Sequence, residues 1–343
     1  MMPLLMSFTT FPNGFYPPNM MYLQLIGCFV VLLLSAEIFI RGAVGLAKIF
    51  HLPPLVIGMT VVAIGTSAPE LVVTMDASLS GSTGLALGNI IGSNIANVLL
   101  ILGVSCMLSA VTGPENPNRR DGIILMAGTA MFALLCGQGV LSFWSGGVLF
   151  LAFLGFLVSS YRTETKDDAA AADLILEVEG IGQIDAPPWA IFLMVLVGMA
   201  GIVWGADLLV DDGVSIARTF GVAEEIIGLT VIALGTSLPE LAASVVAAYR
   251  GHSDIAVGNV VGSNLFNILG IAGLASLVTP LPVSGNILSF DLWVMLGATA
   301  LVMLMLILAG RWHPGRGSGV ILLVLYGAYI AFNGYSAGLF GGS

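Results

Sequence analysis

The chain has 343 residues, of which 57% are hydrophobic and only 9% are charged, and its mean hydropathy is +1.03. These values exclude a soluble globular domain and indicate an integral membrane protein. The formal net charge is −10 and the sequence has no basic patch, which excludes a nucleic acid as a partner.

The N-terminal segment, residues 1–21, is rich in Phe, Pro, Asn and Met and contains no Lys or Arg. A secretory signal peptide requires a basic region ahead of its apolar core, and none is present here. We therefore expect this segment to be an extracytoplasmic extension rather than a cleaved leader.

Ten apolar runs follow, and about 20 residues suffice for a helix to cross a bilayer. The runs lie near residues 22–46, 54–79, 85–110, 121–137, 140–161, 189–216, 224–249, 254–278, 288–310 and 317–338. They form two groups of five, 22–161 and 189–343, separated by the polar stretch 162–188. With five helices per group, the second group enters the membrane from the opposite side. The sequence thus predicts an all-α integral membrane protein with ten transmembrane helices in two inverted five-helix repeats.

The basic residues test this arrangement, because cytoplasmic loops carry an excess of Lys and Arg. In the ten-span plan only Arg218 lies on one side of the membrane. All other basic residues lie on, or near, the opposite side: Arg41, Lys48, Arg119, Arg120, Arg162, Lys166, Arg250, Arg311 and Arg316. We expect an inner-membrane protein with both termini outside and the 162–188 loop in the cytoplasm.

The 162–188 loop is strongly acidic, which raises the possibility of a calcium sensor. Calcium-binding loops use closely spaced ligands and a glycine-dependent turn. Here the alanine run 169–172 interrupts the acids. A solvated linker between the two repeats is the better interpretation.

One twelve-residue motif occurs twice, at Thr60–Leu71 and Thr230–Leu241. Adding 170 to a residue number aligns the two copies, and from residue 54 to residue 103 roughly 23 of about 50 aligned pairs are identical. Such self-similarity indicates that the two halves of the chain share one structure.

Each copy of the motif also predicts a break in its membrane helix, the second helix and the seventh. Gly65 to Ser67 is poor helix sequence, and Pro69 cannot donate a backbone hydrogen bond. We expect the first half-helix to end near Ile64 and the next to begin near Pro69, capped by Ser67 or its neighbour. Backbone carbonyls left free at membrane depth are tolerated only where they line a cavity or bind a ligand.

Glu70 and Glu240 follow these breaks, each inside a strongly apolar run. An ionised carboxylate in hydrocarbon costs several kcal/mol, and no Lys or Arg lies in the membrane interior to neutralise the pair. The two glutamates therefore predict a cation drawn from solution, and two carboxylates balance one divalent ion.

The spans after the breaks carry a polar stripe with a spacing of four residues, which places it on one helical face. Its members are Asn89, Ser93 and Asn97 in the first copy and Asn259, Ser263 and Asn267 in the second. Packing of small residues, with Gly88 and Gly92 as the close-contact pair, is the alternative explanation. The stripe contains no Cys or His, so it favours a hard cation such as calcium or sodium.

Cys28, Cys106 and Cys136 show no metal or redox spacing and are interpreted as small apolar fillers.

The paired Gly-Thr-Ser-x-Pro-Glu and Gly-Asn-x-x-Gly-Ser-Asn-x-x-Asn motifs resemble the alpha-repeats of the sodium/calcium exchanger family, in type, order and copy number. The resemblance implies that calcium and sodium occupy overlapping sites at mid-membrane and that the first and sixth helices slide to expose them alternately. In the first copy it implies ligation by the side chains of Ser67, Glu70 and Ser93, the carbonyls of Ala63 and Thr66, and Asn97 beside them. In the second copy the counterparts are the side chains of Ser237, Glu240 and Ser263, the carbonyls of Ala233 and Thr236, and Asn267.

The chain departs from some members of the family, which have an aspartate at the position of Asn267. Proton/calcium exchangers of the wider superfamily typically have an acid inside the Gly-Asn motif, and this chain has none. Glu37 and Asp207, paired by the repeat, either line the ion routes or mark solvated helix ends.

The sequence therefore predicts a sodium/calcium antiporter. We expect no cofactor, no covalent chemistry and no obligatory protein partner; the partners are the two ions and the lipid bilayer. A proton-coupled or potassium-dependent exchanger is the nearest alternative, and a cation channel is a rival from another class. An intramembrane hydrolase is disfavoured because Ser67 and Ser237 have no His or Lys nearby to act as base.

Overall fold

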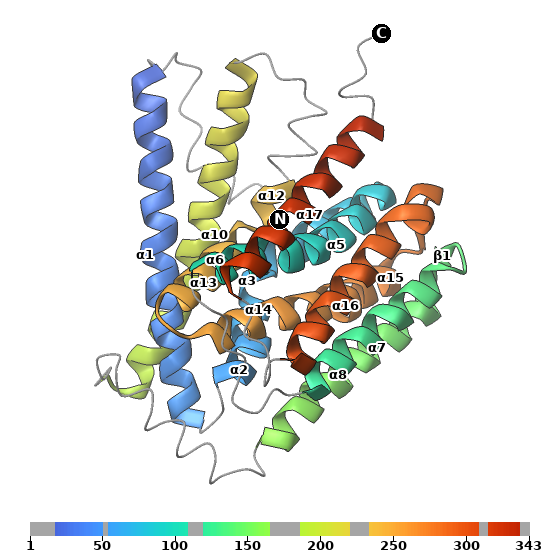
Figure 1. Ribbon diagram of the computed structural model, residues 1–343, viewed down its shortest axis with the longest axis horizontal. Coiled ribbons are helices and arrows are strands. Elements are labelled where there is room, and N and C mark those ends of the chain that lie inside the picture. Colours follow the sequence, from blue (N-terminus) through green and yellow to red (C-terminus); the bar gives the residue numbers. More distant parts are fainter. Residues whose placement is uncertain are drawn as a thin grey trace.

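The computed structural model describes residues 18–50, 54–108, 119–164, 186–219, 233–308 and 315–336, and nearly all of them are helical (Figure 1). The elements of the first half are α1 (Pro18–Phe50), α2 (Pro54–Ile57), the π-helical η1 (Gly58–Val62), α3 (Ala63–Thr66), α4 (Ala68–Leu79), α5 (Thr83–Ala96), η2 (Asn97–Ile101), α6 (Leu102–Leu108), α7 (Arg119–Cys136), β1 (Val140–Leu141) and α8 (Phe143–Glu164). Those of the second half are α10 (Pro188–Thr219), α12 (Ala233–Thr236), α13 (Leu238–Tyr249), α14 (Ser253–Leu265), η5 (Phe266–Ile271), α15 (Ala272–Val278), β2 (Leu281–Pro282), η6 (Ile287–Asp291), α16 (Leu292–Leu308) and α17 (Arg316–Ser336).

The internal repeat of the sequence reappears in the helix bounds. Helices α4 and α13 have 12 residues each, and both of their bounds differ by the same 170 positions that align the sequence. Helices α6 and α15 match in the same way. The same local sequence therefore produces the same helix lengths and breaks in each half.

The long helices α1 and α10 lie side by side as a pair at one edge of the molecule (Figure 1). Glycines let them approach closely: a Cβ on Gly198 would lie 2.6 Å from the backbone nitrogen of Phe39, and one on Gly45 would lie 2.7 Å from Ile191. The later residue of α1, Gly45, meets the earlier residue of α10, Ile191, while the earlier Phe39 meets the later Gly198. These two repeat-related helices therefore run antiparallel. Small residues at a helix–helix seam are typical of membrane proteins.

The remaining helices form a tilted bundle beside this pair (Figure 1). Helix α14 packs against η1, α2 and α13, while α8 packs on α15, α7 on α16 and α6 on α17. The approach of η1 to α14 is close, because a Cβ on Gly58 would lie 2.7 Å from the carbonyl oxygen of Ile255. This contact brings the first broken helix against the polar stripe of the second repeat.

Among the described residues, seven helices are long and apolar enough to cross a membrane, and the bent pair Gly58–Thr66 with Ala68–Leu79 makes an eighth. The chain is therefore a multi-pass integral membrane protein. Two of the ten predicted spans are not in this count. One corresponds to α7, which begins with three charged residues, and the other to α12 with α13, where residues 220–232 lie outside the described part.

The prediction of an all-helical chain misses one feature, a ladder of two residues per strand. Val140 pairs with Pro282 and Leu141 with Leu281 in antiparallel register. The ladder follows a turn at Gly139, whose φ of +83° is a backbone conformation that glycine tolerates best. Strands this short carry no periodic signal, so the sequence cannot show them. Most of the predicted N-terminal segment (1–17) and of the acidic loop (165–185) lies outside the described residues.

Candidate cation site

The first broken helix bends by 51° between its two parts. Ser67 lies at the bend with φ −83° and ψ 12°, and its N–H donates to the carbonyl of Ala63 at 3.0 Å. The helical parts end at Thr66 and resume at Ala68, so the break is narrower than the expected gap from Ile64 to Pro69.

The expectation that Ser67 caps the second half-helix is wrong, because α4 has no side-chain capping hydrogen bond. The hydroxyl of Ser67 is used elsewhere: it donates to Oε1 of Glu240 at 2.6 Å. The bend thus turns this serine away from its own helix and toward the other repeat. A hydrogen bond to a carboxylate is stronger than a neutral capping bond.

Glu70 and Glu240 stand in the first turns of α4 and α13, and each is only 1% exposed. Ser237 donates to Oε1 of Glu70 at 3.4 Å, which repeats the Ser67–Glu240 bond with the halves exchanged. Each glutamate is therefore held by the serine of the opposite repeat. No described Lys or Arg is ion-paired to either carboxylate.

Oxygen atoms of four buried side chains in this region lack any hydrogen-bond partner among the described residues. They are Oε2 of Glu70, Oε2 of Glu240, Oδ1 of Asn97 and Oδ1 of Asn267. A buried polar atom without a partner costs about 1–3 kcal/mol, and more when it is charged. Four such acceptors, two of them on carboxylates, are the arrangement that a bound cation satisfies.

The stripe residues of α5 and α14 close the site from the other side. Ser93 and Ser263 are both buried, and the Oγ of Ser263 lies 3.0 Å from Oγ of Ser67 and 3.5 Å from the carbonyl oxygen of Ala63. Asn97 and Asn267 lie in the π-helical segments η2 and η5. Such segments occur frequently at functional sites because they displace a residue from the regular helical face.

Asn89 and Asn259, the first members of the stripe, hold the glutamate half-helices in place. The Asn89 amide donates to the carbonyl of Glu70 at 3.2 Å and to Oγ1 of Thr74 at 2.9 Å. Asn259 repeats this on the second half, at 3.4 Å to the carbonyl of Glu240 and 2.9 Å to Oγ of Ser244.

The site threonines join the two repeats through these asparagines. Thr66 donates to Oδ1 of Asn259 at 3.2 Å, and Thr236 donates to Oδ1 of Asn89 at 3.5 Å. The side chains of Thr66 and Thr236 thus contact the opposite repeat, while their carbonyls remain the predicted ligand atoms. Ala233 begins α12 at the position that Ala63 has in α3.

One pair of site residues was missed by the sequence reasoning. Asn97 donates to Oδ1 of Asn264 at 3.0 Å, and Asn264 donates to the carbonyl of Asn94 at 3.3 Å. This pairing uses the amide group of Asn97 and leaves its oxygen free. Asn264 lies one residue off the stripe, so spacing alone gave no signal; its identity with Asn94 in the repeat was the only clue.

The packing explanation for the glycines holds for Gly262 and not for its counterpart. A Cβ on Gly262 would lie 2.3 Å from the carbonyl oxygen of Met59, whereas one on Gly92 or Gly88 would meet no described atom within 4 Å. Two halves that are alike in sequence therefore do not pack alike.

Three other acidic residues of interest lie outside the site. Glu37 is ion-paired with Arg41 and Arg250, Asp207 is exposed on α10, and Asp76 is exposed on α4. The described residues contain no group of three or more His, Cys, Asp or Glu side chains placed to hold a metal ion. Two carboxylates with hydroxyl, amide and carbonyl oxygens have the donor chemistry that suits a hard cation better than zinc, copper or iron.

The fold and the site together define a multi-pass membrane protein with a buried, oxygen-lined pair of carboxylates between two repeats. Comparison with known proteins specifies the family. The family model described as "Sodium/calcium exchanger protein" matches residues 20–162 and 190–335, and the chain belongs to that family. The unmatched segment between the two ranges coincides with the acidic loop.

Individual relatives cover most of the chain. A putative antiporter, CaxA, of Alkalimonas amylolytica is 35% identical over 304 residues, covering 88% of this chain and 94% of the relative. The sodium/calcium exchanger MaX1 of Methanosarcina acetivorans is 32% identical over 339 residues, covering 88% and 95%. A solved structure of the sodium-calcium exchanger NCX_Mj superposes with a TM-score of 0.78 at 29% identity and covers 91% of this chain and 98% of that one.

Proposed function

We propose that this chain exchanges sodium for calcium across the inner membrane, with one shared site between Glu70 and Glu240. The observation that carries the proposal is a set of four buried oxygens without a hydrogen-bond partner among the described residues, two on the glutamates and two on Asn97 and Asn267. Neither glutamate is ion-paired with a described Lys or Arg. One calcium ion would neutralise the two charges and satisfy these acceptors. Neither a cofactor nor covalent chemistry is required.

Calcium takes six to eight oxygen ligands, and sodium also binds oxygen. The proposed ligands are the side chains of Ser67, Glu70, Ser93, Ser237, Glu240 and Ser263, the carbonyls of Ala63, Thr66, Ala233 and Thr236, and the amide oxygens of Asn97 and Asn267. The bonds from Ser67 to Glu240 and from Ser237 to Glu70 support this set, since they bring both halves of the constellation together.

The proposed topology has ten spans in two inverted repeats, 22–161 and 189–343, with both termini outside and the 162–188 loop in the cytoplasm. The antiparallel course of α1 and α10 supports it. Two contacts between helix ends support it as well, because the two residues of each contact lie on the same side of the membrane in this plan. Arg120 contacts Ser159 on the cytoplasmic side, and Val140 pairs with Pro282 on the outer side.

Alternating access requires that the two repeats exchange their arrangements. Two differences between matched positions support such a carrier: the serine–glutamate bonds are 2.6 Å and 3.4 Å long, and Gly262 is tightly packed whereas Gly92 is not. A channel has no need of this asymmetry. The pair α1 and α10, which share their own glycine-lined seam, would be the moving unit.

A potassium-dependent exchanger is the alternative with support of its own. The sodium/potassium/calcium exchanger 1 of Rattus norvegicus is 34% identical over 149 residues, though these are only 40% of this chain and 12% of that protein. We expect Asn267 to distinguish potassium-independent from potassium-dependent exchange. Its uncharged amide provides no negative charge to balance an additional monovalent ion.

The test is calcium uptake into proteoliposomes that contain the purified protein, under separately imposed sodium, potassium and proton gradients. An outward sodium gradient alone should drive uptake. If only a proton gradient drives uptake, or if sodium acts only together with potassium, the corresponding alternative replaces our assignment.

A further inference from the structure

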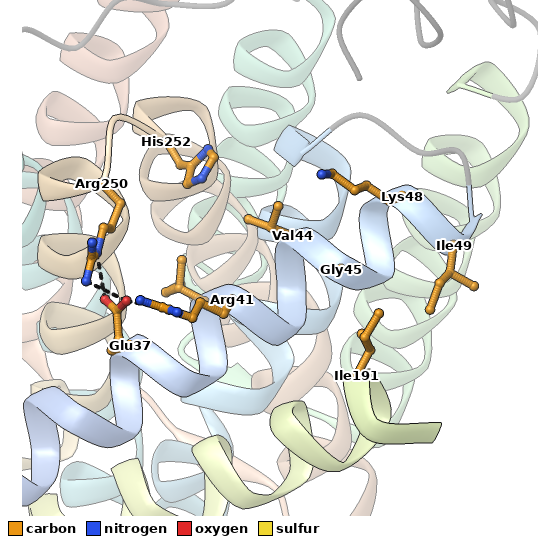
Figure 2. Close-up of a pocket in the computed structure, with 10 residues that line it drawn as sticks. Glu37, Arg41, Val44, Gly45, Lys48, Ile49, Ile191, Arg250 and His252 are labelled. Carbon is orange, nitrogen blue, oxygen red and sulfur yellow. Dashed lines mark hydrogen bonds and ion pairs between the residues drawn. The ribbon is translucent and has the colours of Figure 1, made fainter. Parts of the chain in front are cut away.

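A pocket of about 110 Å³ lies at one end of the α1–α10 pair, outside the cation site (Figure 2). Its walls come from α1, the first turn of α10 and the turn between α13 and α14. Four charged side chains line it: Glu37, Arg41 and Lys48 from α1, and Arg250 from the end of α13. In the proposed topology this end faces the cytoplasmic leaflet.

The charge of the pocket is positive. Arg250 makes two bonds to the Glu37 carboxylate, of 2.6 and 2.8 Å, and Nε of Arg41 makes a third of 2.6 Å (Figure 2). One carboxylate thus holds two guanidinium groups, and their side chains remain 49% and 40% exposed. A guanidinium has five N–H donors, so both retain donors for a further acceptor.

Lys48 supplies an additional charge, about two turns beyond Arg41 along α1. It is half-buried and has no carboxylate partner among the described residues. His252 stands across the pocket from it (Figure 2). Burial lowers the pKa of this histidine; the nearby Asp254 carboxylate opposes this shift, and the Lys48 charge adds to it. The formal count of three cations against one acid leaves a net charge of about +2 for an anion to balance.

Much of the rest of the wall is apolar. Val44, Ile49 and Ile191 line the pocket. Beside them Phe50 and Phe192 are exposed and stack edge to face, with ring centroids 6.2 Å apart. Basic residues and exposed aromatic side chains at helix ends are typical of the lipid headgroup region.

We propose that this pocket binds the headgroup of an anionic phospholipid. The phosphate would take the free N–H groups of Arg41 and Arg250 and the ammonium of Lys48, and an acyl chain would lie along Ile49 and Ile191. A soluble phosphate shares the headgroup chemistry but gains nothing from the apolar wall. Because Arg41 and Lys48 belong to α1 and Arg250 to α13, the lipid would bridge the proposed moving helix to the rest of the bundle.

Lipid binding is measured without any transport, so the result does not depend on the proposed function. Trp189 lies two residues before Ile191 and is 69% exposed, whereas Trp293 is a similarly exposed tryptophan on α16. Each is kept as the single tryptophan, and its fluorescence is recorded in phosphatidylcholine vesicles that contain brominated phosphatidylglycerol or brominated phosphatidylcholine. We expect Trp189 to be quenched preferentially by the anionic lipid and Trp293 to show no preference.

Substitutions at Lys48 test whether its charge contributes to the preference of the pocket for the anionic lipid. Lys48→Gln should reduce the lipid preference at Trp189 by about fivefold, because a basic residue near a membrane surface contributes on the order of 1 kcal/mol, and Lys48→Arg should retain it. Arg316→Gln removes an exposed charge outside the pocket and should leave the preference intact.

Three outcomes would overturn the proposal. Equal quenching of Trp189 by the two lipids means that the pocket does not select an anionic headgroup. An equal loss of preference with Lys48→Gln and Arg316→Gln means that general surface charge attracts the lipid. Loss of the preference in inorganic phosphate, but not in sodium chloride of the same ionic strength, assigns the pocket to a soluble phosphate instead.

Discussion

The hydroxyl of Ser67 donates a 2.6 Å hydrogen bond to the carboxylate of Glu240, which stands 173 positions further along the chain. The equivalent bond from Ser237 to Glu70 measures 3.4 Å. The candidate cation site therefore joins side chains across the two repeats and not within either one. The unequal lengths show that these two matched bonds are not equivalent in this structure.

This asymmetry predicts unequal effects of removing the two hydroxyls. Hydrogen bonds to charged groups contribute about 1.5–3 kcal/mol, and a bond of 3.4 Å is near the outer limit of useful geometry. Ser67→Ala should therefore lower the apparent calcium affinity by at least about tenfold, and Ser237→Ala should lower it less. Calcium titration of the uptake rate in proteoliposomes measures both. Equal losses would mean that the two bonds are equivalent in the membrane.

The packing of Gly262 predicts a second unequal pair. Gly262→Ala forces a methyl group against the backbone of Met59 and against Ala63. Overpacking of this kind costs about 1–3 kcal/mol and displaces the carbonyl of Ala63, so thermal stability in detergent and calcium flux should both fall. Gly92→Ala, at the matched position, should leave stability unchanged or slightly higher, because alanine favours the helix. A destabilised Gly92→Ala protein with an intact Gly262→Ala protein would contradict the packing described.

The topology predicts which loops face the periplasm. Gln138, in the turn after α7, is exposed and should lie outside, while Arg316, at the start of α17, is exposed and should lie inside. Cysteines placed at these positions, with Cys28, Cys106 and Cys136 replaced, are labelled in intact cells with an impermeant reagent. We expect Gln138→Cys to react and Arg316→Cys to react only after permeabilisation. Reaction of both in intact cells would contradict the ten-span plan.

The proposed coupling of sodium to calcium movement predicts that each exchange cycle moves net charge across the membrane. The resemblance to the family implies three sodium ions for one calcium ion, and the sodium-loaded carrier then differs from the calcium-loaded one by one positive charge. A membrane potential should add about 2.3 kcal/mol per 100 mV to the driving force. Flux is recorded in proteoliposomes while an ionophore sets the voltage. A flux that is independent of voltage would contradict this stoichiometry.

The same flux assay tests potassium dependence. Because Asn267 carries no charge, omission of potassium should leave the sodium-driven flux unchanged. The companion variant Asn267→Asp adds a carboxylate and should alter the response to monovalent ions. Strict dependence of the unmodified protein on potassium would show that the role of Asn267 has been misinterpreted.

Much of this architecture could be predicted because the internal repeat is evident from sequence identity at an offset of 170 residues. Two copies of one motif at a fixed offset predicted a helix break just before Pro69, which lies at Ser67, the burial of Glu70 and Glu240, and the family. The spacing of Asn89, Ser93 and Asn97 predicted one shared helical face, and Ser93 and Asn97 are both buried. Buried carboxylates in an apolar chain are so costly that few alternatives compete.

The remaining features depend on tertiary contacts, which local sequence does not encode. Ser67 has the composition of a helix cap, yet its hydroxyl goes to Glu240, because the carboxylate is the stronger acceptor. The asparagine pairing through Asn264 and the different packing of Gly92 and Gly262 arise from how the halves meet. Identical motifs predict identical local structure, so this asymmetry is visible only in the folded protein.

In the proposed mechanism Glu70 and Glu240 together carry the charge that binds calcium, and the effect of removing either charge on calcium flux can be measured. Sodium-gradient-driven calcium uptake is compared for the unmodified protein, Glu70→Gln, Glu240→Gln and the control Asp76→Asn, whose carboxylate is exposed outside the site. At an effective dielectric constant of about 20, one charge pair at about 4 Å contributes roughly 4 kcal/mol, or several hundredfold in affinity. Both glutamate variants should reach the membrane and lose uptake while Asp76→Asn retains it. Uptake near the unmodified level in either glutamate variant would contradict the account.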